Sequence, residues 1–250
     1  MHSRQLRAEV ISASEITPQI VEHLYRLYES CYEGTDPVRF RADLEEKHWV
    51  ILLRDVETQM VAGFSTQILM DVEVNQQPIR SLFSGDTVIY PNYWGSQELV
   101  RGWCRLAGQL KARCGDRPLY WFLISKGYRT YLYLPYFFHE FYPRYDRPTP
   151  LFEQRLIRAL ATAKYPKEFN PQTGLIEHPR SHDRLKWELD STQKRQHNPH
   201  VAFFLQRNAR YREGTELVCV AEISAENMRS IARREIEAAV QTSEPLLLYP

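Results

Sequence analysis

The chain has 250 residues, of which 43% are apolar and 25% are charged. A chain of this length and composition can bury a full-sized core, which excludes intrinsic disorder and disulfide-dependent miniature folds. Its 32 basic and 31 acidic residues give a formal charge of +1, so the overall charge favours neither nucleic acid nor an anionic membrane as a partner. The 15 Tyr, 11 Phe and 5 Trp residues must fill a core or line a site.

The cysteines and the apolar runs bear on where the protein works. The four cysteines form no CxxC pair, and the first residues contain no apolar segment of a signal peptide. We therefore expect a reduced, cytoplasmic protein. The longest apolar runs, at 49–53 and 119–124, are long enough for a strand but far too short to cross a bilayer, so we expect no membrane span.

Two helices are predicted ahead of the first strong strand. Thr17-Pro18 and Asp36-Pro37 each place an N-cap residue before a proline, and apolar residues at helical spacing follow both. The run 48–53 then predicts a strand. Polar turns separate it from further strands at 60–74 and about 79–90.

A glycine interrupts the last of these strands, in Ser84-Gly85-Asp86. Glycine inside a strand is typical of a bulge or of a place that a ligand approaches closely. The clearest helix of the chain follows at 96 to about 113, with Gly115 as its C-cap, and a buried strand is predicted at 119–124.

The remainder of the chain divides at about residue 200. Residues 144–199 are polar and rich in proline and histidine, and we interpret them as an insertion with helical segments at 151–163 and about 182–195. Beyond it, 201–205 and 217–221 are predicted to be paired strands, and a last amphipathic helix includes Met228 to Val240.

Several motifs that carry chemistry are absent from the sequence. There is no GxxxxGK[ST], GxGxxG, HExxH or GxSxG pattern. No sequence motif therefore indicates an NTPase, a dinucleotide-dependent enzyme, a zinc protease or a serine hydrolase.

The order of the predicted elements, with the turn Val88-Ile89-Tyr90-Pro91-Asn92-Tyr93-Trp94-Gly95 before the long helix, resembles the GNAT (GCN5-related N-acetyltransferase) fold of acyl-CoA-dependent acyltransferases. The resemblance implies an α+β fold with a central mixed, mostly antiparallel sheet flanked by helices. Residues 1–143 and 200–250 would form one domain, with the insertion 144–199 before the last strand pair.

In that family, backbone amides after the fourth strand hold the pyrophosphate of coenzyme A, at a helix N-terminus that carries partial positive charge. Pro91, Tyr93 and Gly95 match the family pattern, whereas Trp94 replaces a basic residue, and Gln97 and Leu99 replace glycines. The resemblance implies a coenzyme A thioester as co-substrate, either acetyl-CoA or a longer acyl-CoA. The cofactor-binding residues would be Val88, Tyr90, Tyr93, Trp94, Gly95, Ser96, Gln97 and Glu98.

The resemblance also implies two catalytic residues. A carboxylate near the fourth strand would be the general base, and Asp86 is at that position. A tyrosine after the fifth strand would protonate the departing thiolate, and the spacing indicates Tyr133, or Tyr131 if the helix begins earlier. The alternatives are a bulge in which Asp86 bonds to local backbone amides, and a core position for Tyr133.

The insertion and the segment after it contain histidines and arginines that also need an interpretation. His178, His182, His197 and His200 are close in sequence, but Pro179 breaks their helical spacing, so we expect a polar surface without a metal. Arg207, Arg210 and Arg212 form ion pairs or receive the 3′-phosphate of coenzyme A.

These observations predict an acyltransferase that moves an acyl group from acyl-CoA, or from an acyl carrier protein, to a small-molecule amine by direct attack. The alternative is a catalytically inactive, GNAT-shaped binding protein whose altered glycine loop no longer holds the cofactor. No motif indicates nucleic acid as a partner.

Overall fold

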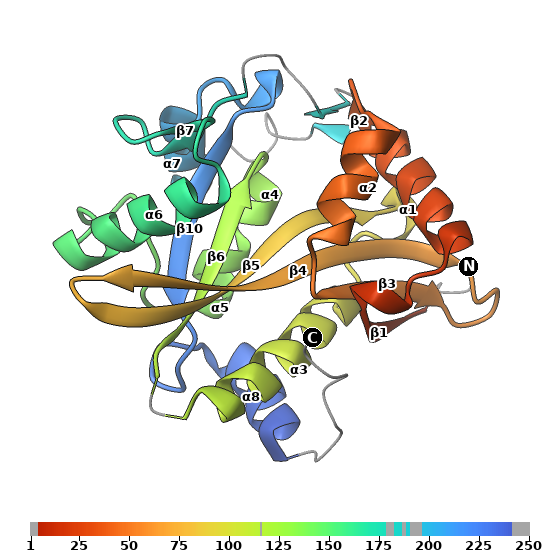
Figure 1. Ribbon diagram of the computed structural model, residues 1–250, viewed down its shortest axis with the longest axis horizontal. Helices are drawn as coiled ribbons and strands as arrows, with labels where there is room; N and C mark the ends of the chain where they lie inside the picture. The colour runs from red at the N-terminus through yellow and green to blue at the C-terminus, as the bar shows by residue number, and fades with distance from the viewer. Residues whose placement is uncertain (1–4, 116, 179–182, 187–188, 191–196, 242–250) are drawn as a thin grey trace.

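The computed structural model describes residues 5–115, 117–178, 183–186, 189–190 and 197–241. One eight-stranded sheet runs through it in the order β1-β3-β4-β5-β6-β10-β8-β7, and a two-stranded sheet pairs β2 with β9 (Figure 1). Neighbouring strands are antiparallel except for β5 and β6, which are parallel. The large sheet consists of β1 (Leu6–Ser12), β3 (Trp49–Asp55), β4 (Val61–Val74), β5 (Gln77–Ile89), β6 (Leu119–Ser125), β7 (Phe169–Asn170), β8 (Leu175–Ile176) and β10 (Glu216–Glu222). The small one consists of β2 (Tyr32–Glu33) and β9 (Arg184–Leu185).

The first two helices begin where the sequence supplies caps. Thr17 accepts a hydrogen bond from the Ile20 amide at the start of α1, and Asp36 accepts from two amides at the start of α2. Both helices have a proline in their first turn, where the missing N–H costs nothing. The helices are α1 (Pro18–Cys31), α2 (Pro37–Glu45), α3 (Glu98–Cys114), α4 (Tyr128–Tyr131), α5 (Tyr133–Phe137), α6 (Leu151–Lys164), α7 (Pro199–Arg207) and α8 (Ser230–Gln241).

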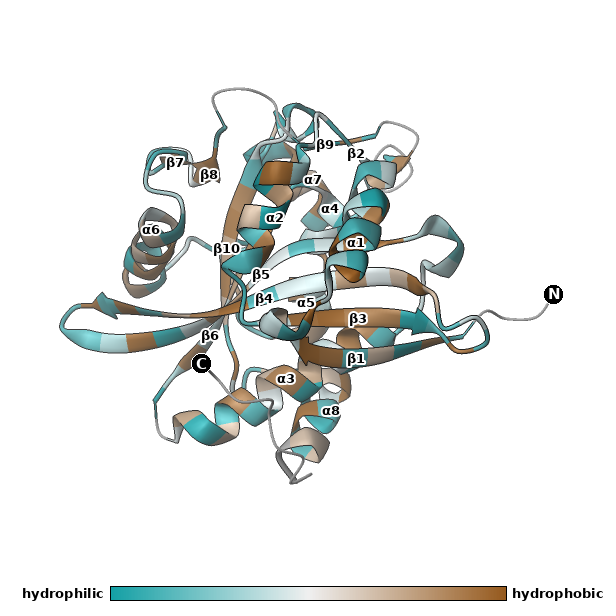
Figure 2. Cartoon of the chain, turned by 45° about the vertical axis from the view of Figure 1, so that its right-hand side comes forward, coloured by the Kyte–Doolittle hydropathy of each residue, from teal (hydrophilic) through white to brown (hydrophobic). Residues whose placement is uncertain are grey.

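Both faces of the sheet are covered, but in different ways. One face carries α3 and α8 over a single large apolar cluster that includes Trp103 and Trp121. The other face carries two separate clusters, one under α1 and α2 around Phe64, and one under α6 around Phe122. Figure 2 shows the apolar strands between these polar-faced helices. The division of the second face leaves room between α2 and α6 for a cavity.

The predicted α+β fold with a mixed, mostly antiparallel sheet is confirmed. The unit of strand, turn, long helix and parallel strand that carried the resemblance to the GNAT fold is formed by β5, α3 and β6. Within the described residues, no helix has the length and apolar character needed to cross a membrane.

Two predictions for the C-terminal part are wrong. Residues 201–205 are helical, in α7, because Asn198 caps the amides of His200 and Val201 and Pro199 occupies the first turn. The expected strand pair is therefore a single strand, β10, which pairs with β6 and β8. In the segment 182–195 the described residues include the short strand β9 rather than a helix, and residues 182, 187–188 and 191–195 lie outside the described part.

One strand was not predicted at all. β1 precedes α1 and pairs with β3 along its whole length, so a strand rather than a helix begins the fold. Its alternating apolar residues, Leu6 and Ala8, face the cluster beneath α3. Because polar and charged residues stand between them, the segment has no apolar run to mark it.

Candidate functional site

The site is built where β5 and β6 part. Their parallel pairing begins at Arg80 and ends at Ser84, opposite Leu123, although β5 continues to Ile89. From Gly85 onward, the edge of β5 that faces β6 has no strand partner in the described part of the chain. A notch therefore opens between the two strands.

A bulge in β5 lies at the base of the notch, as the glycine in the sequence predicted. Ser65 pairs with Thr87 and Gln67 pairs with Ser84, so Thr66 alone faces both Gly85 and Asp86. A Cβ on Gly85 would stand 2.6 Å from the Thr66 Oγ1 atom and 3.1 Å from the Lys47 Cε atom. Any side chain at this position would force one of these neighbours or a strand to shift, so the close approach favours glycine.

Asp86, the predicted base, is the extra residue of this bulge. Its carboxylate is half-buried and makes no hydrogen bond or ion pair with any residue that the structure describes, so the alternative in which local amides bind it does not occur there. Burial and the nearby charge of Asp43 raise the pKa of Asp86 to about 7, with Lys126 and Lys47 offsetting part of the rise. Such a carboxyl group can accept and return a proton near neutral pH.

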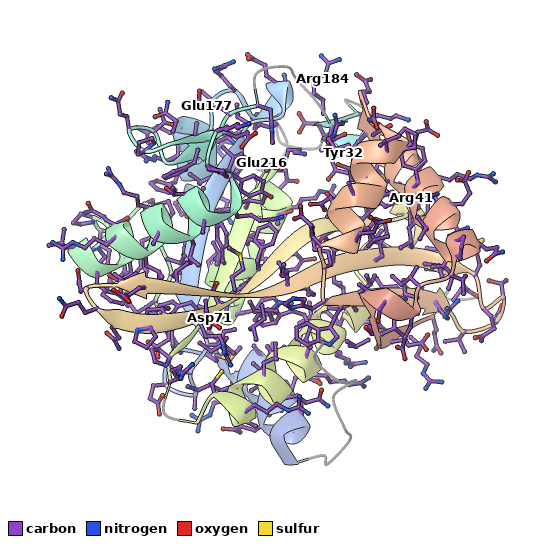
Figure 3. The ribbon with its side chains drawn as sticks, viewed as in Figure 1. Tyr32, Arg41, Asp71, Glu177, Arg184 and Glu216 are labelled. Carbon is purple, nitrogen blue, oxygen red and sulfur yellow. The ribbon has the colours of Figure 1, made fainter. Side chains whose placement is uncertain are left out.

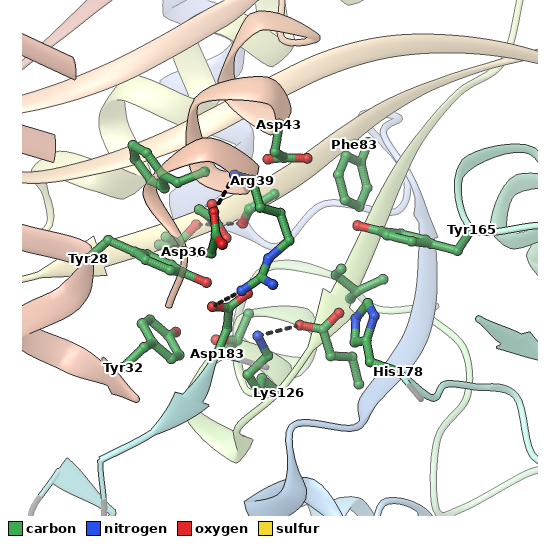
Figure 4. A pocket seen from close by; sticks show the side chains of 17 residues that line it. Tyr28, Tyr32, Asp36, Arg39, Asp43, Phe83, Lys126, Tyr165, His178 and Asp183 are labelled. Carbon is green, nitrogen blue, oxygen red and sulfur yellow. Dashed lines mark hydrogen bonds and ion pairs between the residues drawn. The ribbon is translucent and has the colours of Figure 1, made fainter. Parts of the chain in front are cut away.

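Asp86 lies on the wall of a cavity of about 200 Å³ between α2 and α6, which we call the acidic cavity (Figure 4). Its walls come from α1, β2, α2, β5, β6, α4, β10 and the insertion. In Figure 3, Tyr32 and Glu216 lie on either side of this region. The lining residues are Tyr28, Tyr32, Asp36, Arg39, Phe40, Asp43, Phe83, Gly85, Asp86, Thr87, Ile124, Lys126, Thr130, Tyr165, His178, Asp183 and Glu216.

Two ion pairs cross the acidic cavity. Arg39 of α2 contacts Asp183 of the insertion at 3.0 Å, and Lys126, just after β6, contacts Glu216 of β10 at 3.1 Å. Burial is the largest influence on Lys126 and opposes its charge, but the acidic neighbours together, Glu216 foremost, outweigh it, so the pKa of Lys126 is raised and the side chain stays cationic. The first pair joins the insertion to α2, and the second joins β10 to the segment after β6.

A second cavity, of about 230 Å³, lies beside the turn between β5 and α3, and we call it the loop cavity. Thr87, Tyr32, Lys126 and Thr130 line both cavities, so the two share the notch as a common wall. The loop cavity is lined by Cys31, Tyr32, Thr87, Val88, Ile89, Trp94, Gly95, Ser96, Lys126, Gly127, Tyr128, Arg129, Thr130, Tyr133, Leu185, Leu189, Asp190 and Tyr211.

The turn at the loop cavity exposes backbone. Gly95 has φ of +98°, and nothing lies within 4 Å of the place where a Cβ would be. No side chain caps α3 from its N-cap residue, Gln97, so the partial positive charge at this helix end faces outward. Ser96 accepts a hydrogen bond from the Glu98 amide at 3.3 Å. This geometry can hold an anion such as a pyrophosphate.

The structure divides the eight predicted cofactor-binding residues into two groups. Val88, Trp94, Gly95 and Ser96 line the loop cavity. The remaining four, which are Tyr90, Tyr93, Gln97 and Glu98, do not line it. Three of these four make contacts within the protein. The Tyr93 hydroxyl donates to Asp55 at 2.7 Å, Glu98 accepts from the Ala8 amide and pairs with Arg101, and the Gln97 side chain amide donates to the Gly95 carbonyl.

The replacement of two family glycines does not crowd this turn. The Leu99 side chain is 6% exposed and packs into the core beneath α3. Gln97 is exposed and lies outside the lining of the loop cavity. Trp94, which stands where the family has a basic residue, packs its ring against the guanidinium of Arg129 at 4.0 Å, so a cation from α4 is present near the turn.

Tyr133, the predicted acid, begins α5 and lines the loop cavity. Its hydroxyl has no hydrogen bond among the described residues, and burial raises its pKa, which keeps it protonated. It also lines a small apolar pocket of about 30 Å³ beside the notch, together with Thr87, Trp103 and Leu123. Tyr131, the other candidate, is fully buried and donates its hydroxyl to the Pro143 carbonyl, outside both cavities.

Sequence reasoning missed the residues that the insertion brings to the site. Tyr165, His178 and Asp183 line the acidic cavity, although 144–199 was interpreted as a polar surface. The signal was weak, because the partners of Asp183 and Tyr165, which are Arg39 on α2 and Phe83 on β5, are far away in the sequence. Among the described residues, no group of three His, Cys, Asp or Glu side chains could hold a metal ion, and His182 lies outside them.

The arginines proposed for a 3′-phosphate are separated from one another. Arg210 pairs with Glu213 at 2.7 Å, and Arg212 pairs at 2.9 Å with Asp190, which lines the loop cavity. Arg207 lies elsewhere, in a groove beside α6, and donates to the Thr173 carbonyl.

No protein-family model matches the chain, and no curated protein matches it. Solved structures with partial similarity include a probable N-acyltransferase from Enterococcus faecalis, with 15% identity, a TM-score of 0.40, and coverage of 57% of this chain and 37% of that one. A GCN5-related N-acetyltransferase from Kribbella flavida has 14% identity and a TM-score of 0.39, and covers 56% of this chain and 34% of that one. The GNAT family N-acetyltransferase YhbS from Escherichia coli, in complex with CoA, has 16% identity and a TM-score of 0.33, with 49% and 64% coverage. The chain spans less than two thirds of the length of each.

Proposed function

We propose that the protein transfers a short acyl group from a coenzyme A thioester to an amine. The observation that carries the proposal is the parting of β5 from β6 at Gly85 and Asp86. It leaves a carboxylate in the acidic cavity and a tyrosine in the loop cavity, on two sides of a shared wall.

The residues present suit a coenzyme A thioester in the loop cavity. The exposed backbone at Gly95 and the N-terminus of α3, whose N-cap residue Gln97 supplies no side-chain hydrogen bond, suit the pyrophosphate. The unpaired edge of β5 beyond Ser84 offers peptide groups to the pantetheine amides. The thioester then lies in the notch, and the apolar pocket of about 30 Å³ beside Tyr133 has the volume of one water molecule, which favours an acetyl group over a long chain.

In this mechanism the amine enters through the acidic cavity and attacks the thioester carbonyl directly. A C–N bond forms while Asp86 takes the proton that the nitrogen loses. The C–S bond then breaks, and the departing sulfur takes a proton from the hydroxyl of Tyr133. The products are an amide and coenzyme A, and the two protonation states are restored by exchange with solvent.

Nothing in the loop favours the alternative of an inactive binding protein. That alternative depended on crowding of the pyrophosphate by Gln97 and Leu99, and Leu99 is packed in the core. Donation from an acyl carrier protein stays a prediction, since the pantetheine arm is the same in both donors.

Calorimetric titration with acetyl-CoA tests the proposal, followed by assay of free thiol release with a panel of primary amines. We expect acetyl-CoA to bind and thiol to appear only when an amine is present. Titration with pantetheine and with 3′-dephospho-CoA separates the two donor classes. The absence of heat and of thermal stabilisation with acetyl-CoA would show that the loop cavity does not hold the thioester.

A further inference from the structure

Acidic side chains outnumber basic ones on the wall of the acidic cavity, and Lys47, from outside the lining, pairs with one of them, Asp43, at 2.6 Å. Five carboxylates line it against two permanently charged bases, and His178 adds one imidazole. The carboxylates come from α2, β5, β10 and the insertion, so they meet only in the folded chain. The carboxylates are those of Asp36, Asp43, Asp86, Asp183 and Glu216, and the bases are Arg39 and Lys126.

Both bases are already neutralised by partners. The Arg39 guanidinium pairs with Asp183, and the side chains of Lys126 and Glu216 are only 15% and 10% exposed in their pair. Lys126 also lies 5.2 Å from the centre of the Tyr32 ring. An incoming carboxylate or phosphate would therefore compete with a carboxylate of the protein for either base. An ammonium would meet Asp86, which has no such partner within the described residues.

Aromatic rings form much of the remaining wall. Tyr28 and Tyr32 are stacked with ring centres 4.7 Å apart, and Phe83 and Tyr165 meet edge to face at 6.2 Å. Ring faces attract cations and cover apolar chains. The volume of about 200 Å³ equals that of about seven water molecules, so the bound part of the ligand must be small.

We infer that the acceptor is a small primary amine that carries no acidic group, either an arylalkyl amine or an alkyl diamine rather than an amino acid or a phosphorylated amine. The inference rests on the proposed function, because it takes the acidic cavity as the place of the acceptor. It goes further by fixing the charge of the acceptor. The Arg39–Asp183 and Lys126–Glu216 pairs determine this specificity.

Ligands that differ by one carboxylate test the inference. The first comparison is tyramine with tyrosine, and the second is cadaverine with lysine, each titrated calorimetrically into the protein alone and into the protein saturated with coenzyme A, which has no acyl group to transfer. We expect each amine to bind at least tenfold more tightly than its amino acid. Tyrosine methyl ester has the bulk without the charge, and we expect it to bind within about threefold of tyramine.

Variants that release a base sharpen the test. Asp183→Asn removes the partner of Arg39, and asparagine tolerates the positive φ of 54° at this position. Glu216→Gln does the same for Lys126. In either variant, we expect tyrosine to gain at least fivefold relative to tyramine. Glu33→Gln is the matched control, since it removes the partner of Arg184, the residue next to Asp183, and Glu33 does not line the cavity. The ratio of the tyrosine and tyramine affinities in this variant should equal that of the wild type.

The outcomes separate this inference from the proposed function. Equal affinity for amine and amino acid in the wild type would overturn the inference, whether or not the variants fold. Binding of acetyl-CoA with no binding of either amine would also overturn it and leave the donor side standing. Selective binding of the amines without any binding of acetyl-CoA would support the inference about the cavity and overturn the acyl transfer.

Discussion

The acidic cavity and the loop cavity share a wall but differ in the groups that can contact a ligand. The acidic cavity is lined by charged side chains that come from α2, β5, β10, the end of β6 and the insertion. In the loop cavity, the groups that suit an anion are the exposed backbone at Gly95 and the N-terminus of α3. One side is therefore suited to move a proton, and the other to hold a fixed dianionic group.

This difference separates the effects expected on the two sides. Changes to side chains in the acidic cavity should alter turnover and acceptor choice. Changes at the loop should alter donor affinity. If a substitution on one side affects the quantity assigned to the other, the two cavities do not have the separate tasks proposed for them.

The largest effect is expected for Asp86→Asn. The variant keeps the size of the side chain but removes the proton acceptor, and general bases contribute roughly 10²- to 10⁴-fold to rates. We expect kcat to fall at least 100-fold, with the Kd for acetyl-CoA changed less than threefold. Steady-state kinetics and calorimetry measure the two. Asp71→Asn, on an exposed part of β4, is the control with unchanged turnover. Full activity of the Asp86 variant would remove this carboxylate from the mechanism.

The pH dependence should follow the pKa of Asp86. The base acts only when ionised, and its pKa is raised to about 7, so kcat/KM should rise about tenfold per pH unit below 7 and level off above it. Titration of the acceptor amine adds its own slope. The profile of Asp86→Asn contains only that second slope, so the difference between the two profiles isolates the carboxyl group.

The raised pKa of Asp86 also makes stability depend on pH. The stability contributed by an ion-paired carboxylate rises with pH, whereas that of Asp86 falls. Because the folded-state pKa lies above the unfolded one, the folded chain binds this proton more tightly, and stability is lost as the pH rises towards about 7. Asp86→Asn should therefore be more stable than the wild type at pH 8, by on the order of 1 kcal/mol. At pH 4 this difference should disappear in urea unfolding curves.

On the donor side, the largest effect is expected for Ser96→Asp. Aspartate can still accept the hydrogen bond from the Glu98 amide, so the start of α3 is retained while a negative charge is placed beside the pyrophosphate. We expect the Kd for acetyl-CoA to rise about tenfold, which is about 1.4 kcal/mol, with amine binding unchanged. Asn92→Asp adds the same charge to an exposed position of the turn that does not line the cavity. Equal losses in both variants would mean that only the general charge of the surface matters.

A smaller effect is expected for Tyr133→Phe. A thiolate is a good leaving group, so coenzyme A can depart without a donated proton, though more slowly. We expect kcat to fall about tenfold, with both affinities unchanged. Tyr136→Phe, on the exposed side of the same helix, is the control. A loss of stability in place of turnover would assign Tyr133 to packing.

The sequence was sufficient for the base of the notch and insufficient for its walls. Gly85 and Asp86 are neighbours, so a local pattern can predict a bulge with a carboxylate in it. Asp183 and Glu216 are brought to Arg39 and Lys126 by the pairing of β9 with β2 and of β10 with β6, which no local pattern encodes. The helix at 199–207 was missed for a related reason, since its apolar run suits a strand and only the Asn198-Pro199 cap indicates a helix.

Gly85→Ala tests whether the bulge itself is built on close contact. The new Cβ would stand 2.6 Å from the Thr66 Oγ1 atom, so a strand must shift, and we expect a loss of about 1–3 kcal/mol in the free energy of unfolding. Gly127→Ala is the matched control, because nothing lies within 4 Å of its Cβ position, and it should change stability by less than about 0.5 kcal/mol.

A second substitution locates the cause of that loss. The Thr66 hydroxyl is buried without a hydrogen bond in the described structure, so Thr66→Ala alone should cost little. In the double variant with Gly85→Ala, the contact is gone. We expect the double variant to lose at least about 1 kcal/mol less free energy of unfolding than the sum of the losses in the two single variants. Additive losses would place the strain on the Lys47 side chain instead, 3.1 Å away on the side of the acidic cavity. In that case the contact with Lys47 would limit the residue at position 85, and a substitution at the bulge would also disturb the acidic cavity.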